Sequence, residues 1–145
     1  MMWPMPTKQD KLTHLRNVSL FAECSAKDIA KIAKASDEIE LAAGHVLCDQ
    51  GQTGREAFVI MAGTATVRRN GKKVATLGPG SVVGELSLLD RGPRTATVTT
   101  DTAVTVLVID SRHFAGVLQD IPTLAGKIMG VLAGRIRDFD RTIYG

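Results

Sequence analysis

The residues of this sequence that are best suited to chemistry lie within one short stretch, residues 84–94. Gly84 leaves backbone N–H groups uncovered where a short helix is predicted to begin, and such groups bind anions. Arg94, held directly after Pro93, carries a guanidinium fork that matches the geometry of a phosphate. Glu85 repels phosphate but accepts a hydrogen bond from a sugar hydroxyl. These groups together indicate a site for a sugar phosphate rather than for a bare phosphate.

The same stretch predicts the local structure that would hold these groups. Residues 85–89 are mostly good helix formers with an acidic residue in the first turn, so we expect one helical turn there. Gly92 and Pro93 predict a second turn, and the alternating Thr, Ala and Val of residues 95–98 predict a strand. The plain alternative is a helix, a turn and a strand with an arginine that forms only a surface ion pair.

The run VVGELSLLDRGPRTATV resembles the phosphate-binding cassette of cyclic nucleotide-binding domains, which sense cAMP or cGMP in bacterial regulators, kinase regulatory subunits and ion channels. The resemblance rests on the Gly-Glu-Leu triplet, the small Ser87, the nine-residue step from Glu85 to Arg94, and the segment 93–98. The upstream run QGQTGREAFVIMAGTATV is also similar, and the resemblance covers roughly residues 18–140. It is specific, because several independent residue types would have to coincide.

The resemblance implies roles for the residues of the cassette. Arg94 would bind the cyclic phosphate, and Glu85 would accept the ribose 2′-OH, which excludes deoxynucleotides. Backbone N–H groups of Gly84, Leu86 and Ser87 would face the phosphate, with the small serine side chain leaving room.

The resemblance leaves the choice of base open. A hydroxyl at Thr95 is often associated with acceptance of cGMP, because it can bond the 2-amino group of a syn guanine, although β-propensity alone also explains this threonine. We include Val74 in the predicted site, with Val67 or Leu77 and the final helix as further base contacts. The expected ligand is cAMP, with cGMP as the alternative, and we expect no other cofactor.

The pattern outside the cassette predicts a mainly β fold with flanking helices. Short apolar strands separated by glycine-rich turns are typical of a sandwich or barrel, and a cassette inside it fits an antiparallel β-roll of the jelly-roll or double-stranded β-helix type. We expect a tail and helix over residues 1–17 and one domain over 18–145. Within that domain the roll would span about 37–110, and two C-terminal lid helices about 111–143.

Two local patterns support this division. Ser25 followed by Asp28 predicts a capping box at the start of an N-terminal helix. The basic run of residues 68–73 surrounds Asn70-Gly71, which is typical of a two-residue hairpin turn, so we interpret these basic side chains as a solvated hairpin tip.

The final helix has an apolar stripe that runs nearly to the C-terminus. Gly126, Gly130 and Gly134 fall at every fourth position within it, and each costs about 1 kcal/mol of helix propensity relative to Ala. These glycines would allow close approach to the roll and its ligand or to a second chain, or they belong to a marginal helix without a function. The long stripe makes a homodimer plausible.

Composition excludes several classes of function. The net charge of +3 is too small to indicate nucleic acid binding by itself. Cys24 and Cys48 form no spaced motif, and the three histidines, His14, His45 and His113, have no second ligand at metal spacing, so we expect free thiols and no metal. No serine has a paired His and Asp, so we expect no catalytic residues. No apolar run reaches the length of a membrane helix, and the chain is expected to be soluble and cytoplasmic.

The sequence therefore predicts a non-catalytic cyclic nucleotide sensor that signals through its C-terminal helix to an unknown effector protein. The alternative is the ligand-binding regulatory domain of a truncated transcription factor, channel or transporter. No helix-turn-helix follows the long helix before Gly145, so we expect no direct DNA binding. The lack of a long apolar run predicts no membrane contact.

Overall fold

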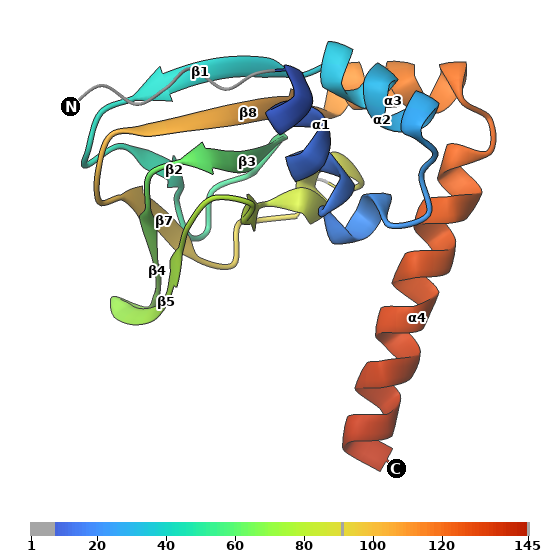
Figure 1. Ribbon diagram of the computed structural model, residues 1–145. Helices are drawn as coiled ribbons and strands as arrows, with labels where there is room; N and C mark the ends of the chain where they lie inside the picture. Colours follow the sequence, from blue (N-terminus) through green and yellow to red (C-terminus); the bar gives the residue numbers. More distant parts are fainter. Residues whose placement is uncertain (1–7, 91, 145) are drawn as a thin grey trace.

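The computed structural model describes residues 8–90 and 92–144 (Figure 1). The helical elements, including two 3-10 turns labelled η, are α1 (Lys8–Arg16), η1 (Ser19–Phe21), α2 (Ala26–Lys34), η2 (Glu85–Leu88), α3 (Ser111–Asp120) and α4 (Leu124–Tyr144). The strands are β1 (Asp37–Leu41), β2 (Val46–Cys48), β3 (Glu56–Ala62), β4 (Ala65–Arg69), β5 (Lys72–Leu77), β6 (Val82–Val83), β7 (Thr97–Thr100) and β8 (Val104–Asp110).

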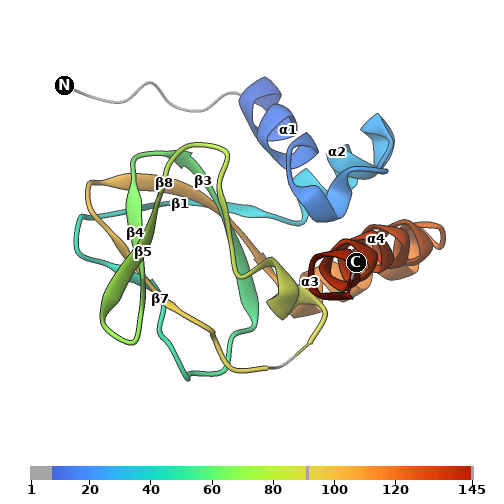
Figure 2. The same ribbon diagram turned by 90° about the horizontal axis from the view of Figure 1, so that it is seen from below.

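The strands form two antiparallel sheets of four strands each. One sheet has the order β1-β8-β3-β6 and the other has the order β2-β7-β4-β5. Figure 2 shows the two sheets curling around a common interior, with the helices gathered on one side. This arrangement confirms the predicted antiparallel β-roll with flanking helices.

The central strand β3 explains how the roll and the helices are joined. Phe58 and Ile60 face the interior of the roll, where they pack with Val98 and Val106. Residues of the opposite face, including Val59, pack against the helices instead. A strand buried on both faces appears as a continuous apolar run rather than as an alternating one, and this accounts for the dense sequence of β3.

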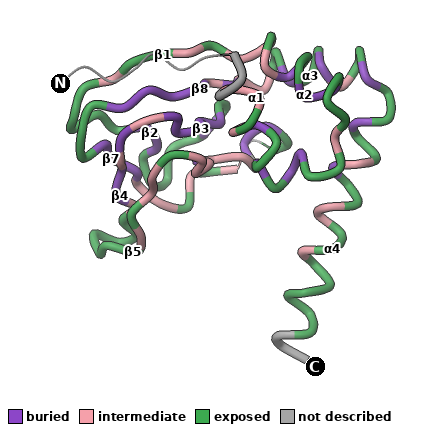
Figure 3. Tube along the Cα trace, viewed as in Figure 1, coloured by how far each residue is buried: buried purple, intermediate pink, exposed green. Residues whose placement is uncertain are grey.

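The helical layer packs on the outer face of the sheet that contains β3 and β8. Phe21 of η1 and Phe114 of α3 stack there with ring centroids 5.9 Å apart. Figure 3 shows that burial follows β3 and β8 and the first turns of α4, and that the rest of α4 is mostly exposed. The C-terminal helix is thus anchored at its start and extends away from the rest of the molecule (Figure 1).

The start of α4 is held by an ion pair to α2. Ser25 and Asp28 form the predicted capping box, in which each side chain accepts from the other residue's backbone N–H at 3.1 Å. The same Asp28 carboxylate, which is buried, accepts from Lys127 Nζ at 2.7 Å. The ammonium group of Lys127 holds the pKa of Asp28 below its usual value of 3.8.

Other local expectations have mixed outcomes. The Asn70-Gly71 hairpin is confirmed, with positive φ angles of 53° and 78°, as a type I′ turn requires. The two expected C-terminal helices are α3 and α4, and α4 begins at Leu124, two residues after Pro122. The expected tail over the first residues lies outside the described part of the chain. No helix within residues 8–90 and 92–144 is both long and apolar enough to cross a membrane.

We predict that in Lys127→Met the free energy of unfolding falls less steeply as the pH is lowered into the acid range. The folded pKa of Asp28 is depressed, so the ion pair stabilises the fold above about pH 4, and this contribution is lost as the pH falls through the folded pKa. Without Lys127 the pKa of Asp28 moves back toward its usual value. The part of the acid-induced loss of stability that comes from this ion pair is then absent. Urea unfolding at a series of pH values measures the slope.

The matched control is Lys31→Met, which removes an exposed lysine from α2 without touching this ion pair. The control should retain the wild-type slope of unfolding free energy against pH. Equal slopes for the two variants would contradict the assignment.

Candidate functional site

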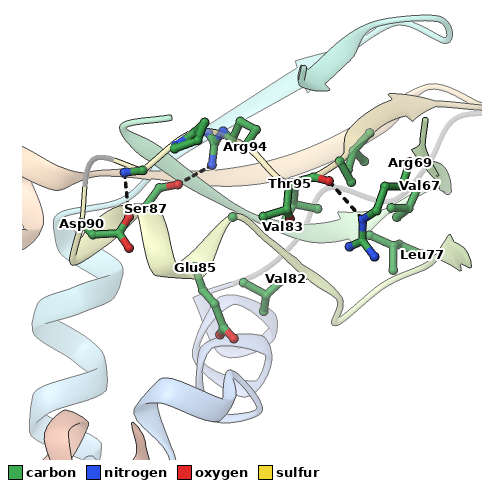
Figure 4. Close-up of a pocket in the computed structure, with 15 residues that line it drawn as sticks. Val67, Arg69, Leu77, Val82, Val83, Glu85, Ser87, Asp90, Arg94 and Thr95 are labelled. Carbon is green, nitrogen blue, oxygen red and sulfur yellow. Dashed lines mark hydrogen bonds between the residues drawn. The ribbon is translucent and has the colours of Figure 1, made fainter. Parts of the chain in front are cut away.

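The cassette lines a pocket of about 420 Å³ that opens between η2 and the β4–β5 hairpin (Figure 4). Its lining combines apolar strand residues with the polar groups of the cassette. The lining residues are Val67, Arg69, Leu77, Val82, Val83, Gly84, Glu85, Ser87, Asp90, Gly92, Pro93, Arg94, Thr95, Ala96 and Val98.

The guanidinium group of Arg94 is fixed at one end of this pocket. Nη1 donates to Ser87 Oγ at 2.7 Å and Nη2 donates to the Glu56 carbonyl at 2.8 Å. Both acceptors are neutral groups. The alternative interpretation, in which this arginine forms only a surface ion pair, is therefore not what these contacts show. A guanidinium group has five N–H donors, so this anchoring leaves donors for an anion.

Two glycines make room for this guanidinium group. A Cβ atom at Gly54 would overlap Arg94 Nε and Cζ, and a Cβ atom at Gly84 would overlap Arg94 Nη1. Gly84 also has a φ of 71°, a conformation that other residues rarely adopt. The φ angle of Gly54 is one that other residues adopt readily. The space taken by the Arg94 side chain is therefore the reason that a residue without a side chain suits this position. The sequence did not assign Gly54 to the site.

The backbone of Arg94 is held by the turn between β2 and β3. Its N–H donates to the Gln52 carbonyl at 2.8 Å, and its carbonyl accepts from Gly51 N–H at 2.9 Å. Thr53 and Pro93 form an isolated bridge beside these bonds. The turn therefore fixes both the main chain and, through Gly54, the side chain of Arg94.

The helical turn of the cassette is a 3-10 helix, η2 (Glu85–Leu88). Its geometry changes one expectation, because the Ser87 N–H donates to the Gly84 carbonyl at 3.0 Å and closes the turn. Ser87 thus contributes to the site through its hydroxyl group, which Arg94 contacts. Leu86 lies within η2, and only its backbone placement is described.

Glu85 links the pocket to the C-terminal helix. Its Oε1 atom forms an ion pair with Arg135 Nη2 of α4 at 3.0 Å. The same Arg135 nitrogen donates to Ser19 Oγ of η1. This contact between the cassette and α4 was not anticipated from the sequence, because no local pattern couples residues so far apart in the chain.

The other end of the pocket is formed by the β4–β5 hairpin. Val67 and Leu77 line it as expected, and Thr95 lies exposed along it. Val74, however, does not line the pocket and is 53% exposed. The register passes from the pair of Val67 with Ala75 to the pair of Arg68 with Lys73, so Val74 is the extra residue of a β-bulge and leaves the inner face.

None of the α4 residues with described side chains, 124–141, lines this pocket. Built Cβ atoms at Gly126, Gly130 and Gly134 would contact nothing within 4 Å. These glycines therefore do not allow close approach to the roll, which was one of the two functional interpretations. Arg69, which the sequence placed on a solvated hairpin tip, lines the pocket instead.

Two other kinds of site, a metal centre and a reactive thiol, have little support in the described residues. No group of three or more His, Cys, Asp or Glu side chains within residues 8–90 and 92–144 could hold a metal ion. Cys24 and Cys48 are free thiols, as expected, and burial raises the pKa of both. A raised pKa disfavours the reactive thiolate.

The fold and the cassette agree with comparisons to known proteins. The family model described as "Cyclic nucleotide-binding domain" matches residues 38–120, and the chain belongs to this family. A "CRP-like cAMP-activated global transcriptional regulator" of Mycobacterium tuberculosis is 28% identical over 128 residues, which are 85% of this chain and 57% of the relative. The chain thus spans little more than half of that regulator's length.

Two solved structures show the same architecture. The N-terminal domain of a transcriptional regulator from Streptomyces coelicolor matches with a TM-score of 0.82 and 31% identity, covering 88% of this chain and 95% of that domain. The regulatory domain of Toxoplasma gondii PKA, solved with cAMP, matches with a TM-score of 0.71 and 27% identity, covering 82% of this chain and 47% of the other. These matches confirm the predicted family and roll.

Proposed function

We propose that this chain binds a cyclic nucleotide, cAMP or cGMP, and acts as a non-catalytic sensor. The observation that carries the proposal is the guanidinium group of Arg94. Ser87 and the Glu56 carbonyl orient it at the end of the pocket, and it forms no ion pair with the side chains that the structure describes. A cyclic phosphate supplies the missing negative charge in a geometry that suits the fork. The cAMP-bound relative supports this ligand class.

The ribose of the ligand is assigned to Glu85. Its Oε1 atom is engaged by Arg135, and the second carboxylate oxygen remains to accept the 2′-OH. A ligand without this hydroxyl group would lose a charge-assisted hydrogen bond, which is worth about 1.5–3 kcal/mol. Deoxynucleotides are therefore expected to bind more weakly.

The signal is assigned to the contact between Glu85 and Arg135. A ribose hydroxyl on Glu85 changes the charge distribution and position of the carboxylate that holds α4, so ligand binding shifts the preference of α4 between attached and released positions. The ion pair of Lys127 with Asp28 keeps the start of the helix in place during this change. An effector protein would recognise the altered position of α4.

A second copy of the chain is the proposed partner for the exposed part of α4. Met129, Ile136 and Phe139 are 68%, 65% and 63% exposed and follow one another at steps of seven and three residues, whereas Leu132 packs partly against the domain's own core. This spacing is that of a coiled-coil seam, which requires a helix with the same repeat. In a self-association the second α4 supplies that repeat.

We predict that Arg94→Glu abolishes binding of cAMP and cGMP while the domain stays folded. The substitution reverses the charge at the phosphate end, and the side-chain hydrogen bonds that Arg94 forms within the described residues go to Ser87 and to a backbone carbonyl. Isothermal titration calorimetry measures binding, and thermal unfolding verifies the fold. Arg68→Glu, an equal change of charge on β4 at a residue outside the pocket, is the control. An unchanged affinity of Arg94→Glu would refute the phosphate role.

We predict that Arg135→Ala uncouples α4 from the pocket. In the wild-type protein, ligand binding should alter hydrogen exchange of α4 amides, whereas the variant should bind ligand with little change there. Arg137→Ala, an exposed arginine of the same helix, is the control and should respond as the wild type does. An identical response of both variants would contradict a signal through Glu85.

We predict that Ile136→Glu converts a dimer into a monomer, because it places charge in the middle of the apolar seam. Size-exclusion chromatography with light scattering measures the mass of the wild-type protein and of this variant. A monomeric wild-type protein at high concentration would refute self-association and leave the pocket proposal unaffected.

A further inference from the structure

Arg69 places a second guanidinium group at the pocket, away from the phosphate end. It lies at the end of β4, shares a strand face with Val67, and lines the pocket together with that residue and Leu77. Its Nε atom donates to the Thr95 carbonyl at 3.1 Å. Figure 4 shows its two terminal nitrogens turned toward Leu77, at the opposite end from Arg94.

The position of Arg69 is fixed by contacts of the hairpin tip. Asn70 N–H donates to Gln50 Oε1 at 2.9 Å, and Gln50 Nε2 donates to Asn70 Oδ1 at 2.9 Å. Gln50 belongs to the segment after β2, so the tip is attached to the roll on one side and through Thr95 on the other. These bonds hold the guanidinium group at the pocket, although Arg69 as a whole is exposed.

The charge of Arg69 is not used elsewhere in the described structure. Among the ion pairs of residues 8–90 and 92–144, none includes Arg69. Only its Nε is engaged, by a neutral carbonyl, so four N–H donors of the terminal nitrogens remain. An acceptor pair in the plane of the guanidinium group would match them.

We propose that Arg69 recognises the base of the ligand and selects a 6-oxopurine, so that the preferred nucleotide is cGMP. This inference rests on the proposed function of the pocket. Guanine presents two acceptors, O6 and N7, on one edge, and arginine bonds this pair in a bidentate manner. Adenine presents N7 with a 6-amino donor on the same edge, and that donor opposes the N–H groups of Arg69.

The neighbouring residues suit the same base. Val67 and Leu77 provide apolar surface for the purine ring beside Arg69. Thr95, whose carbonyl anchors Arg69, carries a hydroxyl group that suits the 2-amino group on the other side of guanine. One guanine would thus be recognised at O6 and N7 by Arg69 and at its 2-amino group by Thr95. This assignment reverses the preference for cAMP that the sequence suggested.

Calorimetric titration with cGMP, cAMP and cyclic inosine monophosphate tests the proposal. Inosine keeps O6 and N7 but lacks the 2-amino group, so it isolates the contribution of Arg69 from that of Thr95. Arg69→Met should weaken cGMP and the inosine nucleotide by about 5- to 150-fold, the range of a bidentate arginine–guanine pair, and cAMP much less. Arg68→Met, on the other face of the same strand, removes the same charge and should leave the preference intact.

Three results would overturn the inference. The first is a wild-type protein that binds cAMP more tightly than cGMP, which would contradict the inference directly. An equal loss for all three nucleotides in Arg69→Met would reduce its role to general electrostatic attraction. An unchanged affinity in that variant would remove Arg69 from the site. Each of these leaves the proposed function intact, whereas a folded wild-type protein that binds none of the three nucleotides refutes both.

Discussion

The site depends on the placement of one guanidinium group that has no ion-pair partner in the described part of the chain. Arg94 is held by a hydroxyl and a carbonyl group, and its space exists because Gly54 and Gly84 have no side chains. A cation in such a setting gains more from an anion than it would in open water, because the surroundings screen less. The β2–β3 turn, the cassette helix and the entry to β7 all hold this group in place.

The fold connects this site to a distant surface through few contacts. Strand β3 is buried on both faces, so the roll and the helical layer share one rigid element. Glu85 is the point where the pocket touches α4, and Lys127 with Asp28 fixes the first turns of that helix. Residues 136–141 of α4, beyond this contact, are exposed (Figure 3). The proposed signal through α4 uses this contrast between its two ends.

Sequence reasoning succeeded where structure is decided locally. The turn, helix and strand around the cassette, the capping box at Ser25 and the Asn70-Gly71 hairpin all follow from neighbouring residues. It failed for Val74, because a β-bulge changes the alternation of the strand, and such an irregularity leaves no clear local pattern. It also missed contacts between distant segments, such as Gly54 with Arg94. The basic hairpin tip predicts a solvated Arg69, because the sequence gives no sign of the hydrogen bond to the Thr95 carbonyl that holds this side chain at the pocket.

The most direct test of the account is a calorimetric titration of Gly54→Ala with cGMP and cAMP, beside the wild-type protein. The added methyl group displaces the flexible end of Arg94 and requires no unfavourable φ angle, so the account predicts a nearly unchanged unfolding temperature and a strong loss of affinity for both nucleotides. Gly78→Ala, at a position where an added Cβ meets nothing within 4 Å, should bind as the wild type does. Wild-type affinity in Gly54→Ala would contradict the claim that a fixed Arg94 guanidinium group creates the site.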